Sequence, residues 1–239
     1  MKRYIYLLLL IICISTNAQT NVVTIVPKVD SVFLSKLTGE FFYEKKQYIG
    51  EQFFNIDWAN GDILLSTGVT ICNKSLKYNG LLDELIWLNT FNFGKFKLDK
   101  SFIAEFWLKN ILGADIHFKQ INVSDTSNIK RQCIFAEVKV EGKLSLYIQR
   151  KISVIGSENV YRNGVLYNYD DIQATPRYYI KLPSNHYLML TKLRRRAFLK
   201  LFPEKKKDIA KIIRVNHLNI KQELDFVRLI ELMNNEVVL

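Results

Sequence analysis

The densest group of side chains that could bind a ligand is a basic run near the C-terminus. Between residues 192 and 214 the chain has ten basic residues and two acidic ones. Arginine binds phosphate and carboxylate groups through paired hydrogen bonds, so the three consecutive arginines at 194–196 are the sharpest part of this run. A charge run is also typical of a helix face that contacts only solvent. The candidate residues for an anionic partner are Arg194, Arg195, Arg196, Lys200, Lys205, Lys206, Lys207 and Lys211.

The other candidates for chemistry are histidines and carboxylates. Asp115 and His117 lie two residues apart, so in a strand they share a face and could form half of a metal site. No other His or Cys has a spacing that completes it, so neither a metal nor a cofactor is expected. The adjacent carboxylates at 83–84 and 170–171 would point to opposite faces of a strand, and they are interpreted as turn and loop residues. The sequence contains neither a Gly-x-Ser-x-Gly elbow nor a glycine-rich phosphate loop, so no catalytic residue is predicted.

The N-terminus has the pattern of a signal peptide. Two basic residues precede an apolar stretch of about eleven residues at 4–14, which is short of the roughly 20 that a membrane span needs. Thr16 and Ala18 are the small residues that signal peptidase requires, so residues 1–18 are predicted to be removed by cleavage after Ala18. An uncleaved N-terminal anchor is the alternative.

Three cysteines are present. Cys13 lies within the signal, and Ile12 precedes it where a lipoprotein signal needs a small residue, so lipidation is not expected. Cys72 and Cys133 remain, both in strand-like runs. In an oxidising compartment they could form a disulfide, or they could be two separate buried thiols, and the sequence leaves both possibilities open.

The charge balance points to an anionic partner. The formal net charge is +11, or +9 without the two basic residues of the signal. This excess favours lipid headgroups, acidic polysaccharide or an acidic protein face. Nucleic acid is not expected, because the chain is predicted to be exported to the periplasm or the outer membrane. No later segment is apolar enough for a transmembrane helix.

From about residue 20 to residue 190 the dominant hydrophobic period is two, which is typical of strands. The alternation over 134–140 resumes after Gly142 and predicts a hairpin with one buried face. Asn163-Gly164 is the strongest signal for a two-residue hairpin turn. Two more hairpin turns are predicted at 67–68 and 183–185. Further strands are predicted at 22–26, 52–57, 84–89 and 115–121, whereas 101–112 fits either a strand or a helix.

After Arg194 the apolar residues recur at helical spacing. Pro203 followed by Glu204 suits a helix start, which predicts a helix over 204–218. A second amphipathic helix is predicted over 220–234. The expected apolar stripes are Ile209, Ile212 and Ile213 in the first helix, and Leu224, Val227, Ile230 and Met233 in the second.

These patterns predict an α+β fold, mainly an antiparallel β-sheet with a C-terminal α-helical hairpin. The sheet could be a meander, a curved sheet or a partial barrel. Residues 19–192 would form the β domain, and residues 193–239 the hairpin packed on or beside it. An eight-stranded outer-membrane barrel is disfavoured for two reasons. The chain ends in charged helices, and several strands are shorter than the roughly 9–11 residues that a strand needs to cross a membrane.

Three segments resemble a group of uncharacterised exported proteins of Bacteroidota. They are the signal ending Ala18-Gln19, the run from Trp58 to Leu65 with its continuation to Leu85, and the segment from Phe202 to Asn235. The resemblance covers the start, about 40–90 and about 175–235. It implies export and a β-rich body with a helical tail, and it supplies no activity and no catalytic residues.

The function expected from the sequence is that of a non-enzymatic exported binding or scaffold protein of the cell envelope. Its basic C-terminal helical face would meet an anionic envelope component or an envelope protein. The first alternative is an envelope glycan hydrolase with carboxylates from distant strands. The second is the small outer-membrane barrel.

Overall fold

The computed structural model describes residues 37, 39–44, 48–124 and 131–236. The predicted signal peptide at 1–18 and the predicted strand at 22–26 lie outside them. The strands of the main sheet are β1 (Gly39–Phe41), β3 (Ala59–Leu65), β4 (Thr70–Asn79), β5 (Glu84–Leu88), β6 (Lys95–Leu98), β7 (Ile103–Ile111), β8 (Ala114–Ser124), β9 (Arg131–Val140), β10 (Ser145–Gln149), β13 (Arg177–Lys181) and β14 (Tyr187–Leu190). A second sheet contains β2 (Tyr48–Ile49), β11 (Ile152–Arg162) and β12 (Val165–Ala174). The helices are α1 (Arg195–Leu201), α2 (Lys206–Val215) and α3 (Glu223–Glu236), and a short 3-10 turn, η1 (Lys100–Phe102), precedes β7.

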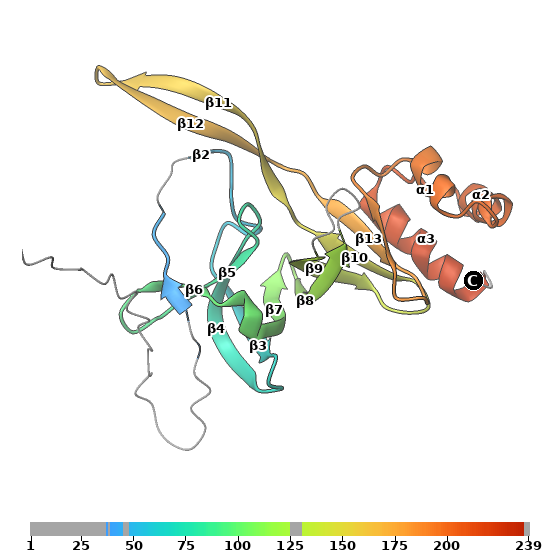
Figure 1. The fold of residues 1–239 in the computed structure, drawn as a ribbon, viewed down its shortest axis with the longest axis horizontal. Coiled ribbons are helices and arrows are strands. Elements are labelled where there is room, and N and C mark those ends of the chain that lie inside the picture. Colours follow the sequence, from blue (N-terminus) through green and yellow to red (C-terminus); the bar gives the residue numbers. More distant parts are fainter. Residues whose placement is uncertain (1–36, 38, 45–47, 125–130, 237–239) are drawn as a thin grey trace, which may run out of the picture.

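The eleven strands of the main sheet have the order β1-β6-β5-β4-β3-β7-β8-β9-β10-β13-β14. Each strand is antiparallel to its neighbours. Among the described strands β1 and β14 are the two edges, so the sheet stays open. This confirms the predicted α+β class with a mainly antiparallel sheet and C-terminal helices (Figure 1).

The sheet curls so strongly that the turn between β4 and β5 reaches β9 and the start of β11. The Gly80 carbonyl accepts a hydrogen bond from Ile152 N (3.0 Å), and Asp83 accepts one from Phe135 N (3.2 Å). A Cβ atom at Gly80 would lie 2.4 Å from the Arg150 carbonyl oxygen, so only glycine allows this approach. The curled part is therefore a partial barrel, one of the forms that the sequence left open.

Aromatic side chains fill the inside of this curl. Phe106 and Phe118 stack with ring centroids 4.7 Å apart, and Tyr78 lies 4.9 Å from Phe118. The prediction that β9 has only one buried face is wrong, because Phe135 packs inside the curl while Ile134 packs in a separate cluster on the other face. Both faces of β9 are covered, since the sheet folds back on itself.

The predicted hairpins are confirmed. Gly68 has a φ of 84°, and Asn163 and Gly164 have φ of 51° and 77°, the left-handed conformations that their turns need. The ambiguous segment at 101–112 forms η1 and β7. The predicted strand at 52–57 is wrong, because only one isolated bridge forms there and the Asn55 side chain donates to the Asp57 carbonyl instead.

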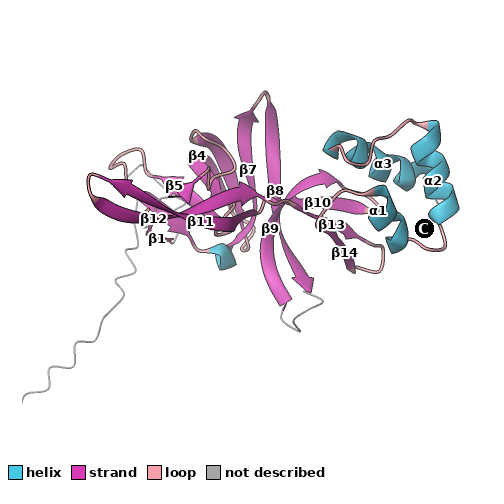
Figure 2. Cartoon of the chain, turned by 90° about the horizontal axis from the view of Figure 1, so that it is seen from above, coloured by secondary structure: helices cyan, strands magenta, loops and turns pink. Residues whose placement is uncertain are grey.

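The C-terminal helices pack on β10, β13 and β14 (Figures 1 and 2). The described residues form three helices where a two-helix hairpin was predicted, because 195–201 makes a helix of its own before Pro203. The stripe of α2 is confirmed, but Leu224 of α3 is 82% exposed. Phe226 is buried instead and contacts the rings of Tyr178 (5.8 Å) and Phe198 (5.3 Å). Within the described part of the chain, no helix is long and apolar enough to cross a bilayer.

Strands β11 and β12 form a long hairpin, here called the arm, that extends away from the main sheet (Figures 1 and 2). They pair along their whole length, and β2 adds a short parallel pairing at Asp170 and Asp171. The arm is therefore held to the body mainly at its base.

Candidate functional site

The structure places the predicted anion-binding residues on α1, α2 and the segments beside them. We call Arg194, Arg195, Arg196, Lys200, Lys205, Lys206, Lys207 and Lys211 the basic surface. Lys205 is half-buried and the other seven residues are exposed. The opposite side of the same helices buries Phe198, Leu199, Ile209 and Ile213 in the core, so the cations cannot turn inward.

None of the eight side chains of the basic surface forms an ion pair with a described residue. Some cations of the β-sheet differ in this respect, because Lys97, Lys109 and Lys119 each lie beside a carboxylate. An anionic ligand could therefore bind these cations of the basic surface without first breaking an ion pair within the described part of the protein.

The two cysteines are free, with Cys72 exposed and Cys133 half-buried, so the structure forms neither the disulfide nor the pair of buried thiols that the sequence left open. Cys72 lies on β4 and Cys133 on β9, with β3, β7 and β8 between them. Burial raises the pKa of the Cys133 thiol above its ordinary value, which disfavours the reactive thiolate.

His117 belongs to an ion-pair cluster between β7 and β8. Its Nε2 lies 2.8 Å from Oε2 of Glu105, and its ring stacks on Trp107 at 4.6 Å. Lys119 Nζ lies 3.1 Å from the other oxygen of Glu105. Asp115 instead accepts a hydrogen bond from Asn110 N in the turn. Asp115 and His117 thus have separate partners, and the described residues contain no group of three possible metal ligands.

This cluster gives a prediction for acid stability. Burial alone raises the pKa of Glu105, but hydrogen bonds from Lys119 and His117 outweigh it, and the net pKa is lowered. The carboxylate therefore contributes stability above the ordinary value of 4.5 that is lost as the pH falls through the lowered pKa. We expect Glu105→Gln to lower the free energy of unfolding by about 1 kcal/mol at pH 7. Urea titrations at several pH values should show this difference in unfolding free energy shrinking below about pH 4.5.

Glu204→Gln, at an exposed position, is the control. If the difference between Glu105→Gln and the wild type were the same at all pH values, the lowered pKa of Glu105 would not be its source.

Asp83 lies in the turn between β4 and β5, as interpreted from the sequence, and its half-buried carboxylate also forms a junction that the sequence did not reveal. Its carboxylate accepts from the Tyr78 hydroxyl (2.7 Å) and from Phe135 N (3.2 Å), and it forms an ion pair with Lys100. Burial raises the pKa of the Asp83 carboxyl, although all three partners oppose that change. Burial and the Asp83 charge together raise the pKa of Tyr78 well above its ordinary value. The junction ties the β4–β5 turn to β9.

Arg150 forms a second junction that the sequence did not reveal. Its Nε lies 2.5 Å from Oε2 of Glu137, and its two terminal nitrogens lie 2.8 and 2.6 Å from the oxygens of Glu223. Glu137 is only 2% exposed, and it also contacts Lys139. The guanidinium therefore links β9, in the sheet, to the first turn of α3.

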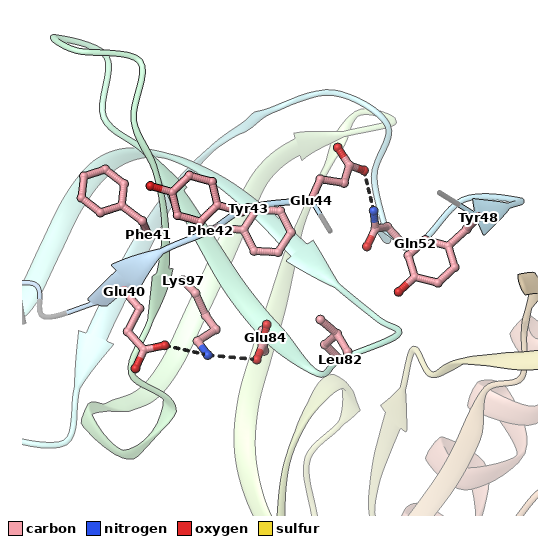
Figure 3. A pocket seen from close by; sticks show the side chains of 10 residues that line it. All are labelled: Glu40, Phe41, Phe42, Tyr43, Glu44, Tyr48, Gln52, Leu82, Glu84 and Lys97. Atoms are coloured by element: carbon pink, nitrogen blue, oxygen red, sulfur yellow. Dashed lines mark hydrogen bonds and ion pairs between the residues drawn. The ribbon is translucent and has the colours of Figure 1, made fainter. Parts of the chain in front are cut away.

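An open cleft lies between the β1–β2 segment, β5 and β6. It has a volume of about 360 Å³ and adjoins a cavity of about 440 Å³ that shares four of its residues. Figure 3 shows Lys97 between two carboxylates, with Nζ 3.2 Å from Glu40 and 3.6 Å from Glu84. The lining residues are Glu40, Phe41, Phe42, Tyr43, Glu44, Tyr48, Gln52, Leu82, Glu84 and Lys97.

The cleft bears on the alternative of a glycan hydrolase, because Glu40 and Glu84 come from different strands. A glycosidase places its substrate between two carboxyl groups. Here both carboxylates contact the same ammonium group, so Lys97 occupies the position that a scissile bond would need. Glu40 is also 75% exposed, whereas the catalytic acid of a glycosidase is usually shielded. This cleft therefore lacks the arrangement of carboxylates that a glycosidase needs.

Comparison of the chain with protein-family models, with curated proteins and with solved structures gives no match.

Proposed function

We propose that this chain is an exported, non-enzymatic binding or scaffold protein of the cell envelope, and that its basic surface binds an anionic envelope component. One observation carries the proposal: eight cations lie on the outward side of α1 and α2 without an acidic partner among the described residues. Support for export comes from the N-terminal signal pattern.

The residue types favour phosphate or carboxylate groups as the ligand. Arg194, Arg195 and Arg196 are consecutive and exposed, and each guanidinium can hold an oxyanion through two hydrogen bonds. The lysines of α2 add point charges that attract the same ligand over about a Debye length. Binding of this kind weakens as the salt concentration rises.

The test is a triple charge reversal, Arg194→Glu, Arg195→Glu and Arg196→Glu. At low salt we expect it to weaken co-sedimentation with isolated envelope membranes on the order of 100-fold, since each cation near an anionic surface contributes about 1 kcal/mol. Far-UV circular dichroism of the variant should be unchanged, because all three side chains are exposed.

The matched control reverses three exposed lysines outside the basic surface, Lys95→Glu, Lys143→Glu and Lys221→Glu. It changes the net charge by the same amount, so it should retain most of the binding. If the arginine variant binds as tightly as the wild type, or if both variants lose binding equally, the basic surface is not the binding site.

A further inference from the structure

The far end of the arm carries large apolar side chains that the body does not cover. The exposed fractions are 74% for Tyr161, 52% for Val165, 50% for Leu166 and 44% for Tyr167. We call these four residues the arm tip. They flank the Asn163-Gly164 turn, which is the point of the arm farthest from the main sheet (Figures 1 and 2).

The arm tip is apolar on both faces of the hairpin. Tyr161 pairs with Leu166, which places both side chains on one face. Val160 pairs with Tyr167, and this pair lies on the opposite face together with Val165, whose pairing partner is Arg162. A groove on a partner protein would cover one face of the hairpin and leave the other in water. The apolar layer of a lipid bilayer would cover both faces at once.

The shaft of the arm changes abruptly to polar residues. Asn159 pairs with Asn168 and the two side chains share a hydrogen bond of 3.0 Å, and Ser157 pairs with Asp170. The end of the arm beyond these polar pairs is three residue pairs long, or about 10 Å at 3.3 Å per residue. Five of its six paired residues are uncharged, and the sixth is Arg162, which pairs with Val165 beside the turn. Interfacial segments enter the headgroup and acyl boundary of a bilayer to about 5–10 Å, so the length of this end matches this depth.

We propose that the arm tip inserts into the interface of a phospholipid bilayer while the basic surface contacts anionic headgroups of the same bilayer. Both surfaces suit an anionic bilayer: the four tip side chains are uncharged, the neighbouring Arg162 is cationic, and the basic surface is cationic. Figure 1 shows the end of the arm and α1 toward opposite ends of the long axis of the molecule, both in the upper half of the view. Tyrosine is enriched at this depth because its ring is apolar and its hydroxyl is polar. Insertion of the tip stands by itself, whereas the headgroup contact rests on the proposed function.

The experiment places a fluorophore at the arm tip. A Leu166→Cys substitution, in a mature chain that carries Cys72→Ser and Cys133→Ala, is labelled with a polarity-sensitive dye. Vesicles of phosphatidylcholine alone and with phosphatidylglycerol are then added. We expect the dye emission to become brighter and to shift to the blue with both vesicle types. Binding should be tighter to the anionic vesicles, and the blue shift of the bound protein should not depend on the salt concentration.

Two variants complete the design. Tyr161→Asp with Leu166→Asp should weaken flotation with phosphatidylcholine vesicles at least about tenfold, since carboxylates resist leaving water. Gln173→Asp with Ala174→Asp, at exposed positions near the base of the arm, adds the same charge and should float as the wild type does.

The outcomes separate this inference from the proposed function. Unchanged dye emission with vesicles that bind the protein would overturn tip insertion and leave the basic surface as the binding site. No binding to either vesicle, or equal flotation of the tip variant, would also overturn it. An emission change that requires envelope proteins would assign the tip to a protein partner instead. A different result is that the triple arginine variant still changes the dye emission and binds anionic vesicles as tightly as the wild type. That result would reject only the proposed function.

Discussion

Replacing Arg150 by methionine is expected to lower the free energy of unfolding by about 3–5 kcal/mol. The substitution keeps much of the side-chain volume but leaves Glu137, which is 2% exposed, without its guanidinium partner. It also removes both hydrogen bonds to Glu223, so α3 loses its charged contact with the sheet. Urea unfolding followed by circular dichroism measures the change.

Arg228→Met is the matched control, because Arg228 lies on α3 and is exposed. Its effect should stay within about 0.5 kcal/mol. A second comparison combines Arg150→Met with Glu137→Leu and Glu223→Leu, which removes the charges together. Because the main cost of the single substitution is a buried carboxylate that keeps only Lys139 as a cationic partner, the combined variant should recover part of the lost stability. An Arg150→Met effect no larger than that of Arg228→Met would show that the junction contributes little.

Asp83→Ala is expected to lower the free energy of unfolding by about 3 kcal/mol. The substitution leaves the buried Tyr78 hydroxyl and the Phe135 N–H without their acceptor, and it leaves Lys100 without its carboxylate. Asp83→Asn should cost less, since an amide oxygen still accepts from the hydroxyl and the N–H. The same urea titration gives both values.

Asp57→Ala is the control for this series, because Asp57 is exposed in the segment before β3. Hydrogen exchange adds a positional readout: the Phe135 amide should lose protection in Asp83→Ala more than amides of β13, which lies away from the junction. Equal stability of Asp83→Ala and Asp57→Ala would refute the role of Asp83.

The sequence predicted the features that local chemistry determines. Asn163-Gly164 and Thr67-Gly68 marked their turns because positive φ angles need these residues. The stripe of α2 was visible because its buried isoleucines follow the helical period. The basic surface was also found from the sequence, since a charge run needs no tertiary contact to be recognised.

The two junctions could not be predicted, because their partners are far apart in the chain. Asp83 and Phe135 are separated by 52 residues, and Arg150 and Glu223 by 73. Glu137 appeared to lie on a polar strand face, and only the curl of the sheet shows that this face is covered. Leu224 was assigned to the buried stripe of α3 because periodicity alone does not select the face, which the contacts of Phe226 determine.

The curl of the sheet also sets an order for folding. A chain that emerges N-terminus first presents the β4–β5 turn well before β9, the strand that must cover it. Until then Asp83 and the aromatic residues beside it stay open to water, with β-strand edges unpaired. Contacts of such long sequence separation slow folding and lengthen the time in which a nascent chain can aggregate. The partial barrel thus lengthens the time during synthesis in which the nascent chain can aggregate, up to the moment when β9 is in place.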